Sequence, residues 1–333
     1  MHGRVVGTYN PTLLCSCLKQ EIEPERRTLS TRMSNIKLNG IFPPVTTPFN
    51  DQGDVDYAAL SSNIARYNQD GLAGYVGLGS NGEVVHLSTE ERARVIETIK
   101  RAAASEHTII AGVNELSTRA AIEAARAAAD SGADAALVVT PYYYKASMTQ
   151  DAFIRHFSEV ADHSPLPVLI YNVPQNTGVV IESGAIAKLA MHQNIIGVKD
   201  SAGNMGAISE TIRQSPSKFA VMVGNGSILF PSLMMGATGA VLAIACAAPR
   251  ACVDLYEAVR AGDNQRGREL QNRIAPLSHI VTAGLGVPGL KAAMEMLGLV
   301  GGAPRAPLAA VSSSERERIK AVIRETGLFP EIE

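Results

Sequence analysis

The sequence predicts an α/β fold: a (β/α)8 barrel of the TIM type, followed by a C-terminal extension of three helices. Short, continuously apolar segments recur eight times between residues 40 and 244. Continuous rather than alternating hydrophobicity is typical of strands that are buried on both faces of a parallel sheet. A stretch with helical periodicity follows each segment, and eight βα units in about 220 residues fit a closed barrel better than an open doubly wound sheet.

The strands are expected within these apolar segments, because each is short and ends at polar or glycine-containing residues. In order they are GIFPPVTTPF (40–49), GYVGLG (74–79), TIIAGV (108–113), AALVVT (135–140), PVLIYNV (167–173), IIGVKD (195–200), FAVMVG (219–224) and GAVLAI (239–244).

The helices are expected between the strands, where apolar residues recur with helical spacing. The barrel helices are predicted at 56–69, 89–104, 117–131, 149–162, 181–191, 204–214, 226–236 and 247–261. Ser88 and Glu91 form a capping box that predicts the start of the second helix. Three further helices are predicted at 263–283, 288–299 and 312–327, and the Pro- and Gly-containing segment GAPRAPLAAVS forms the loop before the last one.

We therefore expect a barrel over residues 37–262, a helical extension over 263–333 and an N-terminal tail over 1–36 that is disordered or serves for targeting. Residues 1–33 are irregular and lack the apolar core of a secretory signal. Three glutamates in this tail also argue against a transit peptide, and Met33 could serve as an alternative start. The expected location is cytoplasmic or mitochondrial, not secreted.

Composition and motifs exclude several classes of function. The formal net charge is −2 and no basic block occurs, so no nucleic-acid partner is expected. No run of about 18 apolar residues occurs, so no membrane partner is expected either. The four cysteines and seven histidines show no zinc spacing, and no P-loop is present, so we expect no metal and no cofactor.

The segment GLGSNG matches the dinucleotide-binding pattern G-x-G-x-x-G through Gly77, Gly79 and Gly82. The capping box, however, places the next helix start near residue 89, and no acidic residue ends the following strand. These glycines are better suited to bringing backbone N–H groups close to a small ligand.

Polar residues at the strand ends are the best candidates for chemistry, since barrel enzymes place their active sites at the C-terminal ends of the strands. Lys199 ends the sixth strand, Tyr171 lies near the end of the fifth, and three tyrosines follow the fourth. A neutral lysine amine can attack a ketone to form a Schiff base, which then accepts electrons as a neighbouring bond breaks. The alternative for Lys199 is an ion pair with Asp200.

Four motifs resemble, in order and spacing, the signatures of the dihydrodipicolinate synthase / N-acetylneuraminate lyase family of class I, pyruvate-dependent aldolases. They are GSNGE (79–83), TPYYY (140–144), YNVPQNTG (171–178) and IIGVKDSAG (195–203). The likeness runs from about Gly40 to Leu328. Within the family, VVTPYYYK, KDSAG, GVPGLKAAMEMLGLVGG and PRAPL most resemble 4-hydroxy-2-oxoglutarate aldolase.

The resemblance implies that Lys199 forms a Schiff base with pyruvate or another 2-keto acid and that Tyr171 is the acid/base. It also implies that Ser80 relays protons to Tyr171 and that Tyr143 completes the relay across a dimer interface, so that the protein is a homo-oligomer, a dimer or tetramer. The substrate-binding residues implied are Asn81, Gly82, Asn176, Ser201, Gly224 and Val241. As purely structural alternatives, Tyr143 would be a packing aromatic and Ser80 and Asn81 would be turn residues.

Two departures from the family pattern bear on the substrate. Synthases usually carry an arginine where this chain has Asn176, and they read Thr-Thr where it has Ser80-Asn81. Asparagine cannot make the bidentate pair with a carboxylate that arginine makes. The expected reaction is therefore cleavage of a 4-hydroxy-2-keto acid, foremost 4-hydroxy-2-oxoglutarate to pyruvate and glyoxylate. The alternatives are 4-hydroxy-tetrahydrodipicolinate synthase, another 2-keto-3-deoxy acid or sialic acid aldolase, and a catalytically silent barrel that binds a keto acid.

Overall fold

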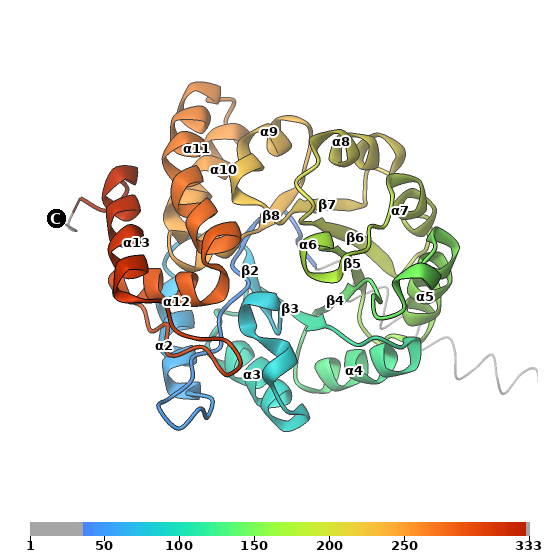
Figure 1. The fold of residues 1–333 in the computed structure, drawn as a ribbon. Coiled ribbons are helices and arrows are strands. Elements are labelled where there is room, and N and C mark those ends of the chain that lie inside the picture. The colour runs from blue at the N-terminus through green and yellow to red at the C-terminus, as the bar shows by residue number, and fades with distance from the viewer. Residues whose placement is uncertain (1–35, 331–333) are drawn as a thin grey trace, which may run out of the picture. The chain divides into compact units, whose positions relative to one another are not determined.

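The computed structural model of the protein describes residues 36–330 (Figure 1). Eight parallel strands form one sheet in the order β1-β8-β7-β6-β5-β4-β3-β2, which confirms the predicted (β/α)8 barrel. The strands are β1 (Gly40–Phe42), β2 (Gly74–Gly77), β3 (Thr108–Val113), β4 (Ala135–Val139), β5 (Val168–Asn172), β6 (Ile195–Asp200), β7 (Ala220–Val223) and β8 (Gly239–Val241).

The seam between β1 and β2 closes the barrel, and the Ala73 N–H, just before β2, donates there to Ile41 O at 3.0 Å. Pro43 and Pro44 follow β1, and because proline has no N–H to donate, the strand ends at Phe42 instead of running through the apolar segment to residue 49. The Val76 N–H donates to Pro43 O at 3.0 Å, and the Val45 N–H donates to Val76 O at 3.0 Å. These two bonds continue the pairing past the prolines.

The barrel helices lie close to their predicted positions. They are α2 (Tyr57–Tyr67), α3 (Thr89–Ala102), α4 (Thr118–Asp130), α5 (Gln150–His163), α7 (Ser183–Leu189), α8 (Met205–Gln214), α9 (Leu229–Met234) and α10 (Pro249–Arg260). The capping box between Ser88 and Glu91 is present at the start of α3. A short helix that the sequence did not indicate, α6 (Pro174–Thr177), begins at the proline that follows β5.

The three predicted C-terminal helices are present as α11 (Asn264–His279), α12 (Gly286–Met296) and α13 (Ser313–Thr326). A π-helical turn, Ile280–Gly284, joins the first two. α11 packs on α10 and α13, and α13 also packs on α12. The chain from Lys37 onward is one compact unit, so the extension is continuous with the barrel. The prediction for the tail, residues 1–35, lies outside the described residues.

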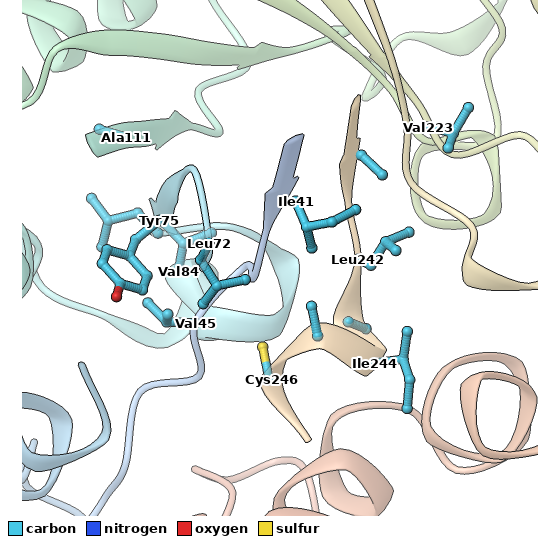
Figure 2. Close-up of a cluster of buried hydrophobic side chains, with 14 of the residues drawn as sticks. Ile41, Val45, Leu72, Tyr75, Val84, Ala111, Val223, Leu242, Ile244 and Cys246 are labelled. Carbon is cyan, nitrogen blue, oxygen red and sulfur yellow. The ribbon is translucent and has the colours of Figure 1, made fainter. Parts of the chain in front are cut away.

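Part of the apolar core lies where β1, β2 and β8 meet the turn that follows β8 (Figure 2). Ile41, Tyr75 and Leu242 are buried there, and Cys246 is a buried free thiol in the same cluster. This packing ties the closing seam of the barrel to its last strand. Within residues 36–330, no helix is both long enough and apolar enough to cross a membrane.

Candidate active site

Lys199 and Tyr171 lie side by side at the C-terminal ends of β6 and β5. The two residues are in register in the parallel pair, so their side chains point to the same face of the sheet. Lys199 Nζ lies 4.2 Å from the centroid of the Tyr171 ring. Both residues are only 4% exposed. The structure thus brings together the two residues that the sequence proposed for Schiff-base chemistry.

The alternative ion pair between Lys199 and Asp200 is not formed. Asp200 is the next residue of the strand, so its side chain points to the opposite face. Its carboxylate accepts hydrogen bonds from Asn172 Nδ2 at 2.7 Å and from the Ala202 N–H at 2.9 Å. Across the described part of the chain, no carboxylate lies within salt-bridge distance of Lys199. The amine is therefore not held in a structural ion pair.

Ser80 reaches Tyr171 from the turn that follows β2. Its Oγ lies 3.3 Å from the Tyr171 hydroxyl oxygen. Burial alone would raise the pKa of the Tyr171 phenol, but the Lys199 ammonium and hydrogen bonds that include the one with Ser80 outweigh it. The pKa of Tyr171 is therefore held below its ordinary value. A phenol tuned in this way is suited to accept and return a proton.

The turn Ser80–Gly82 is a single turn of 3-10 helix, and Ser80 places it beside Tyr171. The Gly82 N–H is used within the turn, where it donates to Gly79 O at 3.0 Å. The N–H groups of Ser80 and Asn81 have no acceptor among residues 36–330. They are thus available to a carboxylate. The next α-helix, α3, begins at Thr89, so the glycine pattern here does not open an α-helix as a dinucleotide site requires.

Gly224, just after β7, leaves the space that Ser201 and Lys199 occupy. A Cβ at this position would lie 1.9 Å from Ser201 Oγ and 3.2 Å from Lys199 Cε. Any larger residue would therefore displace Ser201 and press on Lys199. The predicted site residues Ser201 and Gly224 thus lie beside Lys199. Gln175, which the sequence reasoning did not single out, donates from Nε2 to Ser201 O.

Asn176 contacts Ser80, so it also belongs to this cluster. Its Nδ2 donates to Ser80 Oγ at 3.3 Å, which leaves the Ser80 hydroxyl free to donate to Tyr171. Ser80 and Asn176 also border a cavity of about 210 Å³. Its lining residues are all uncharged: Ser80, Val84, Val85, Asn114, Val139, Tyr142, Val173, Asn176 and Thr177. Asn114 was not among the predicted site residues, although it follows β3.

Two predicted residues lie away from this cluster within the chain. Tyr143 is 71% exposed and packs edge-to-face on Tyr144, with 5.2 Å between the ring centroids. It does not reach Tyr171 in the same chain, so its role in the relay stays a prediction about an assembly. Val241 is the buried last residue of β8, in register with Phe42, and its part in binding also stays a prediction. Between residues 36 and 330, no group of three metal-ligating side chains occurs.

Comparison with known proteins gives consistent matches along the chain. Residues 37–326 match the profile described as the dihydrodipicolinate synthetase family. The 4-hydroxy-tetrahydrodipicolinate synthase of Methanothrix thermoacetophila is 36% identical over 285 residues, which cover 85% of this chain and 95% of the relative. The enzyme of the same name from Methanopyrus kandleri is 34% identical over 297 residues, 89% of this chain and 98% of the relative. The crystal structure of dihydrodipicolinate synthase from Aquifex aeolicus matches with a TM-score of 0.82 at 32% identity, covering 87% of this chain and 99% of that one.

Proposed function

The chain belongs to the dihydrodipicolinate synthetase family, and we propose that its Lys199 forms a Schiff base with the keto group of pyruvate or of a larger 2-keto acid. Enzymes of this family are lyases of the aldolase type that work through a lysine imine, and this protein is an enzyme of that class. The observation that carries the assignment to Lys199 is its burial, without a carboxylate partner, against Tyr171. A buried amine without such a partner is costly, which favours a catalytic role.

The proposed reaction begins when the neutral amine of Lys199 adds to C2 of the substrate. With one proton taken from solvent, the C2 hydroxyl then leaves as water and a protonated imine remains. Tyr171 takes the proton of the C4 hydroxyl as the C3–C4 bond breaks, and the electron pair of that bond moves into the imine to form an enamine. Protonation at C3 and hydrolysis then release pyruvate. Ser80 is placed to relay the proton, because its Oγ lies 3.3 Å from the Tyr171 hydroxyl.

The substrate carboxylate next to C2 would bind at the turn after β2. The free N–H groups of Ser80 and Asn81 supply donors there, and hydrogen bonds to an ionised acceptor are stronger than neutral ones. Ser201 and Gly224 would border the same pyruvyl group, because they lie against Lys199. This part of the proposal holds for any substrate that contains a pyruvyl unit.

For the remainder of the substrate, we propose 4-hydroxy-2-oxoglutarate, cleaved to pyruvate and glyoxylate. Its second carboxylate is attached to C4, the carbon that carries the reacting hydroxyl. Asn176 lies one hydrogen bond from Ser80, and Ser80 lies one hydrogen bond from Tyr171. An amide donor at that distance from the reacting oxygen suits a carboxylate on the reacting carbon.

The second candidate is condensation of pyruvate with aspartate semialdehyde, the reaction of 4-hydroxy-tetrahydrodipicolinate synthase. The relatives described above carry that name and match nearly the whole barrel and its extension, which favours this candidate. Against it stands Asn176, at the position where synthases of the family usually carry arginine. The two candidates share the imine at Lys199 and differ in the aldehyde.

Two measurements test the proposal. Borohydride reduction in the presence of pyruvate should add mass to the peptide that contains Lys199, whereas Lys199→Ala should take up none and Lys218→Ala, which changes an exposed lysine, should be labelled normally. An adduct on another residue contradicts the mechanism.

Turnover of 4-hydroxy-2-oxoglutarate is then compared with condensation of pyruvate and aspartate semialdehyde. Faster cleavage supports our assignment, and a clear preference for aspartate semialdehyde establishes the synthase instead. Asn176→Arg should improve the use of aspartate semialdehyde, because it restores a cation at that position.

A further inference from the structure

Glu83 and Lys291 form a buried ion pair that joins the turn after β2 to the C-terminal extension. Glu83 Oε1 lies 2.6 Å from Lys291 Nζ, and both side chains are 1% exposed. The other carboxylate oxygen accepts the Arg305 N–H at 2.9 Å and lies 3.3 Å from His86 Nδ1. Lys291 also donates to Ala303 O at 2.9 Å. Glu83 directly follows Ser80–Gly82, whereas Lys291 is in α12, which lies on the same side of the barrel as α2 (Figure 1).

Fold stability alone does not explain this pair. Removing two charges from water costs several kcal/mol per ion, and well-packed apolar residues in place of a buried pair are often as stabilising or more so. A buried pair does, however, fix the relative position of its two partners closely, since either charge left alone would be strongly unfavourable. Because the pair lies next to candidate catalytic residues, it is suited to positioning the turn that carries them.

The backbone of the turn is strained at both ends, which supports such a role. Leu78 has φ 58° and Glu83 has φ 52°, so two residues other than glycine adopt the left-handed conformation on either side of Gly79–Gly82. Such conformations cost of order 1–3 kcal/mol each and persist only where the surroundings impose them. The side chain of Glu83 is held by Lys291 and by the backbone N–H of Arg305, and its own backbone N–H donates to Ser80 O at 3.2 Å.

Two further contacts hold the turn from the barrel itself. Thr47 Oγ1, after β1, donates to Gly82 O at 2.7 Å. Asn114 Nδ2, after β3, donates to Leu78 O at 3.0 Å. The barrel thus fixes Leu78, which precedes the turn, and Gly82, its last residue, and the extension fixes Glu83, the residue that follows.

We propose that the Glu83–Lys291 pair positions the Ser80 and Asn81 N–H groups for the carboxylate of pyruvate, so that the C-terminal extension sets the affinity of the active site for keto acids. Glu83 and Lys291 act through the turn and do not touch the substrate. The inference rests on the proposed function of the turn. Because it concerns pyruvate alone, it does not depend on which aldehyde the enzyme uses.

The test measures borohydride labelling of Lys199 as a function of pyruvate concentration, together with the thermal midpoint of each variant. Glu83→Gln combined with Lys291→Met removes both charges and nearly preserves volume. Glu83→Asp keeps the charge but shortens the side chain by one methylene. Glu295→Gln is the matched control. Glu295 is in α12, as Lys291 is, but it forms an exposed ion pair with Arg316 of α13, in which Oε2 of Glu295 lies 3.1 Å from a guanidinium nitrogen of Arg316.

In both Glu83 variants, we expect the half-saturating pyruvate concentration to rise about tenfold or more, as when a charge-assisted hydrogen bond is misplaced. The labelled fraction at saturation should match the native protein, because Lys199 and Tyr171 are on other strands, and the thermal midpoint of the double variant should stay close to native. Glu295→Gln should leave both quantities unchanged.

Native half-saturation in a folded variant of Glu83 would overturn the inference. Loss of fold in both Glu83 variants would also overturn it, since the pair would then serve stability alone. If the native protein takes up no pyruvate at Lys199, the proposed function itself fails, and that outcome is distinct from either of these.

Discussion

At the level of single residues, the chemistry of the site depends on how Lys199 and Tyr171 are surrounded. The amine lies against the phenol ring, and the neighbouring carboxylate of Asp200 is bound by Asn172 instead. Ser80 joins the pair from a different strand end, and Asn176 donates to Ser80. The hydrogen-bond chain Asn176–Ser80–Tyr171 therefore leads from the proposed aldehyde end of the substrate to the base.

Replacing Tyr171 with phenylalanine should separate imine formation from bond cleavage. The ring that packs on Lys199 stays, but the hydroxyl that we propose as acceptor of the C4 proton is lost. We expect pyruvate labelling of Lys199 to persist, while steady-state cleavage falls roughly 10²–10⁴-fold, the usual contribution of a general base. The measurement is pyruvate release alongside mass spectrometry of the reduced adduct.

The matched control is Tyr256→Phe, which removes a half-buried hydroxyl on α10 that donates to Thr238 O at 3.5 Å. Its turnover should stay native. Unchanged cleavage in Tyr171→Phe would mean that another group accepts the proton.

At the level of secondary-structure elements, residues at the ends of neighbouring strands pack tightly against one another. Gly224, after β7, lies against Ser201 and Lys199, and a Cβ there would be 1.9 Å from Ser201 Oγ. Gly224→Ala should therefore weaken labelling of Lys199 by pyruvate, because Ser201 has to move and Lys199 Cε, 3.2 Å from the added Cβ, has to shift slightly. We expect far-ultraviolet circular dichroism to stay native, and Gly184→Ala, whose Cβ meets no atom within 4 Å, to behave as the native protein does. Native labelling of Gly224→Ala would show that the site tolerates displacement.

The contact between α4 and α5 should make stability depend on pH. His156 in α5 lies 2.9 Å from Thr118 Oγ1 through its Nδ1, and burial lowers its pKa to about 4. In the unfolded chain its pKa is about 6.5, so between pH 6.5 and 4 the unfolded state binds the proton and the native state does not. The free energy of unfolding should therefore fall as the pH falls through this window.

The pH effect can be measured by urea unfolding at pH 7 and pH 4.5. Between pH 7 and pH 4.5, the free energy of unfolding of the native protein should fall by about 2 kcal/mol more than that of His156→Gln. The control is His163→Gln, which changes a histidine with a 51% exposed side chain. Its free energy of unfolding should fall by as much as that of the native protein. Equal losses for the native protein and His156→Gln would show that His156 does not carry the effect.

At the level of the whole molecule, the active site combines the barrel with its extension. The ring of strands supplies Lys199 and Tyr171, and α12 supplies the partner of Glu83. Tyr143 and Tyr144, after β4, are 71% and 72% exposed. Such a pair of exposed aromatics is typical of a contact surface.

If a second copy covers that surface, Tyr143 enters the relay of its partner, and activity depends on assembly. We expect specific activity to fall on dilution, in step with the fraction of dimer or tetramer measured by analytical ultracentrifugation. Tyr143→Phe should lower turnover without changing the mass of the assembly, because the ring stays and only the hydroxyl is lost. A fully active monomer would refute this arrangement.

Much of the fold could be predicted because it depends on local signals. The eight strands, the capping box of α3 and the three C-terminal helices were all indicated by periodicity and caps, and all are present. The predicted lengths of individual strands were less accurate. β1 ends early because two prolines follow it, and β2 ends at Gly77 because Leu78 is left-handed.

The sequence by itself determined the barrel and the placement of Lys199 and Tyr171 at the ends of successive strands. Buried parallel strands require continuous apolar segments, and a barrel places the residues at all its strand ends on one side. Only the tertiary structure decided that Asn176 contacts Ser80, that Gly224 makes room for Ser201 and that Glu83 pairs with Lys291. Each of these contacts joins residues from different elements, and its existence depends on distances of a few ångströms that arise only when the closed barrel and its extension pack together.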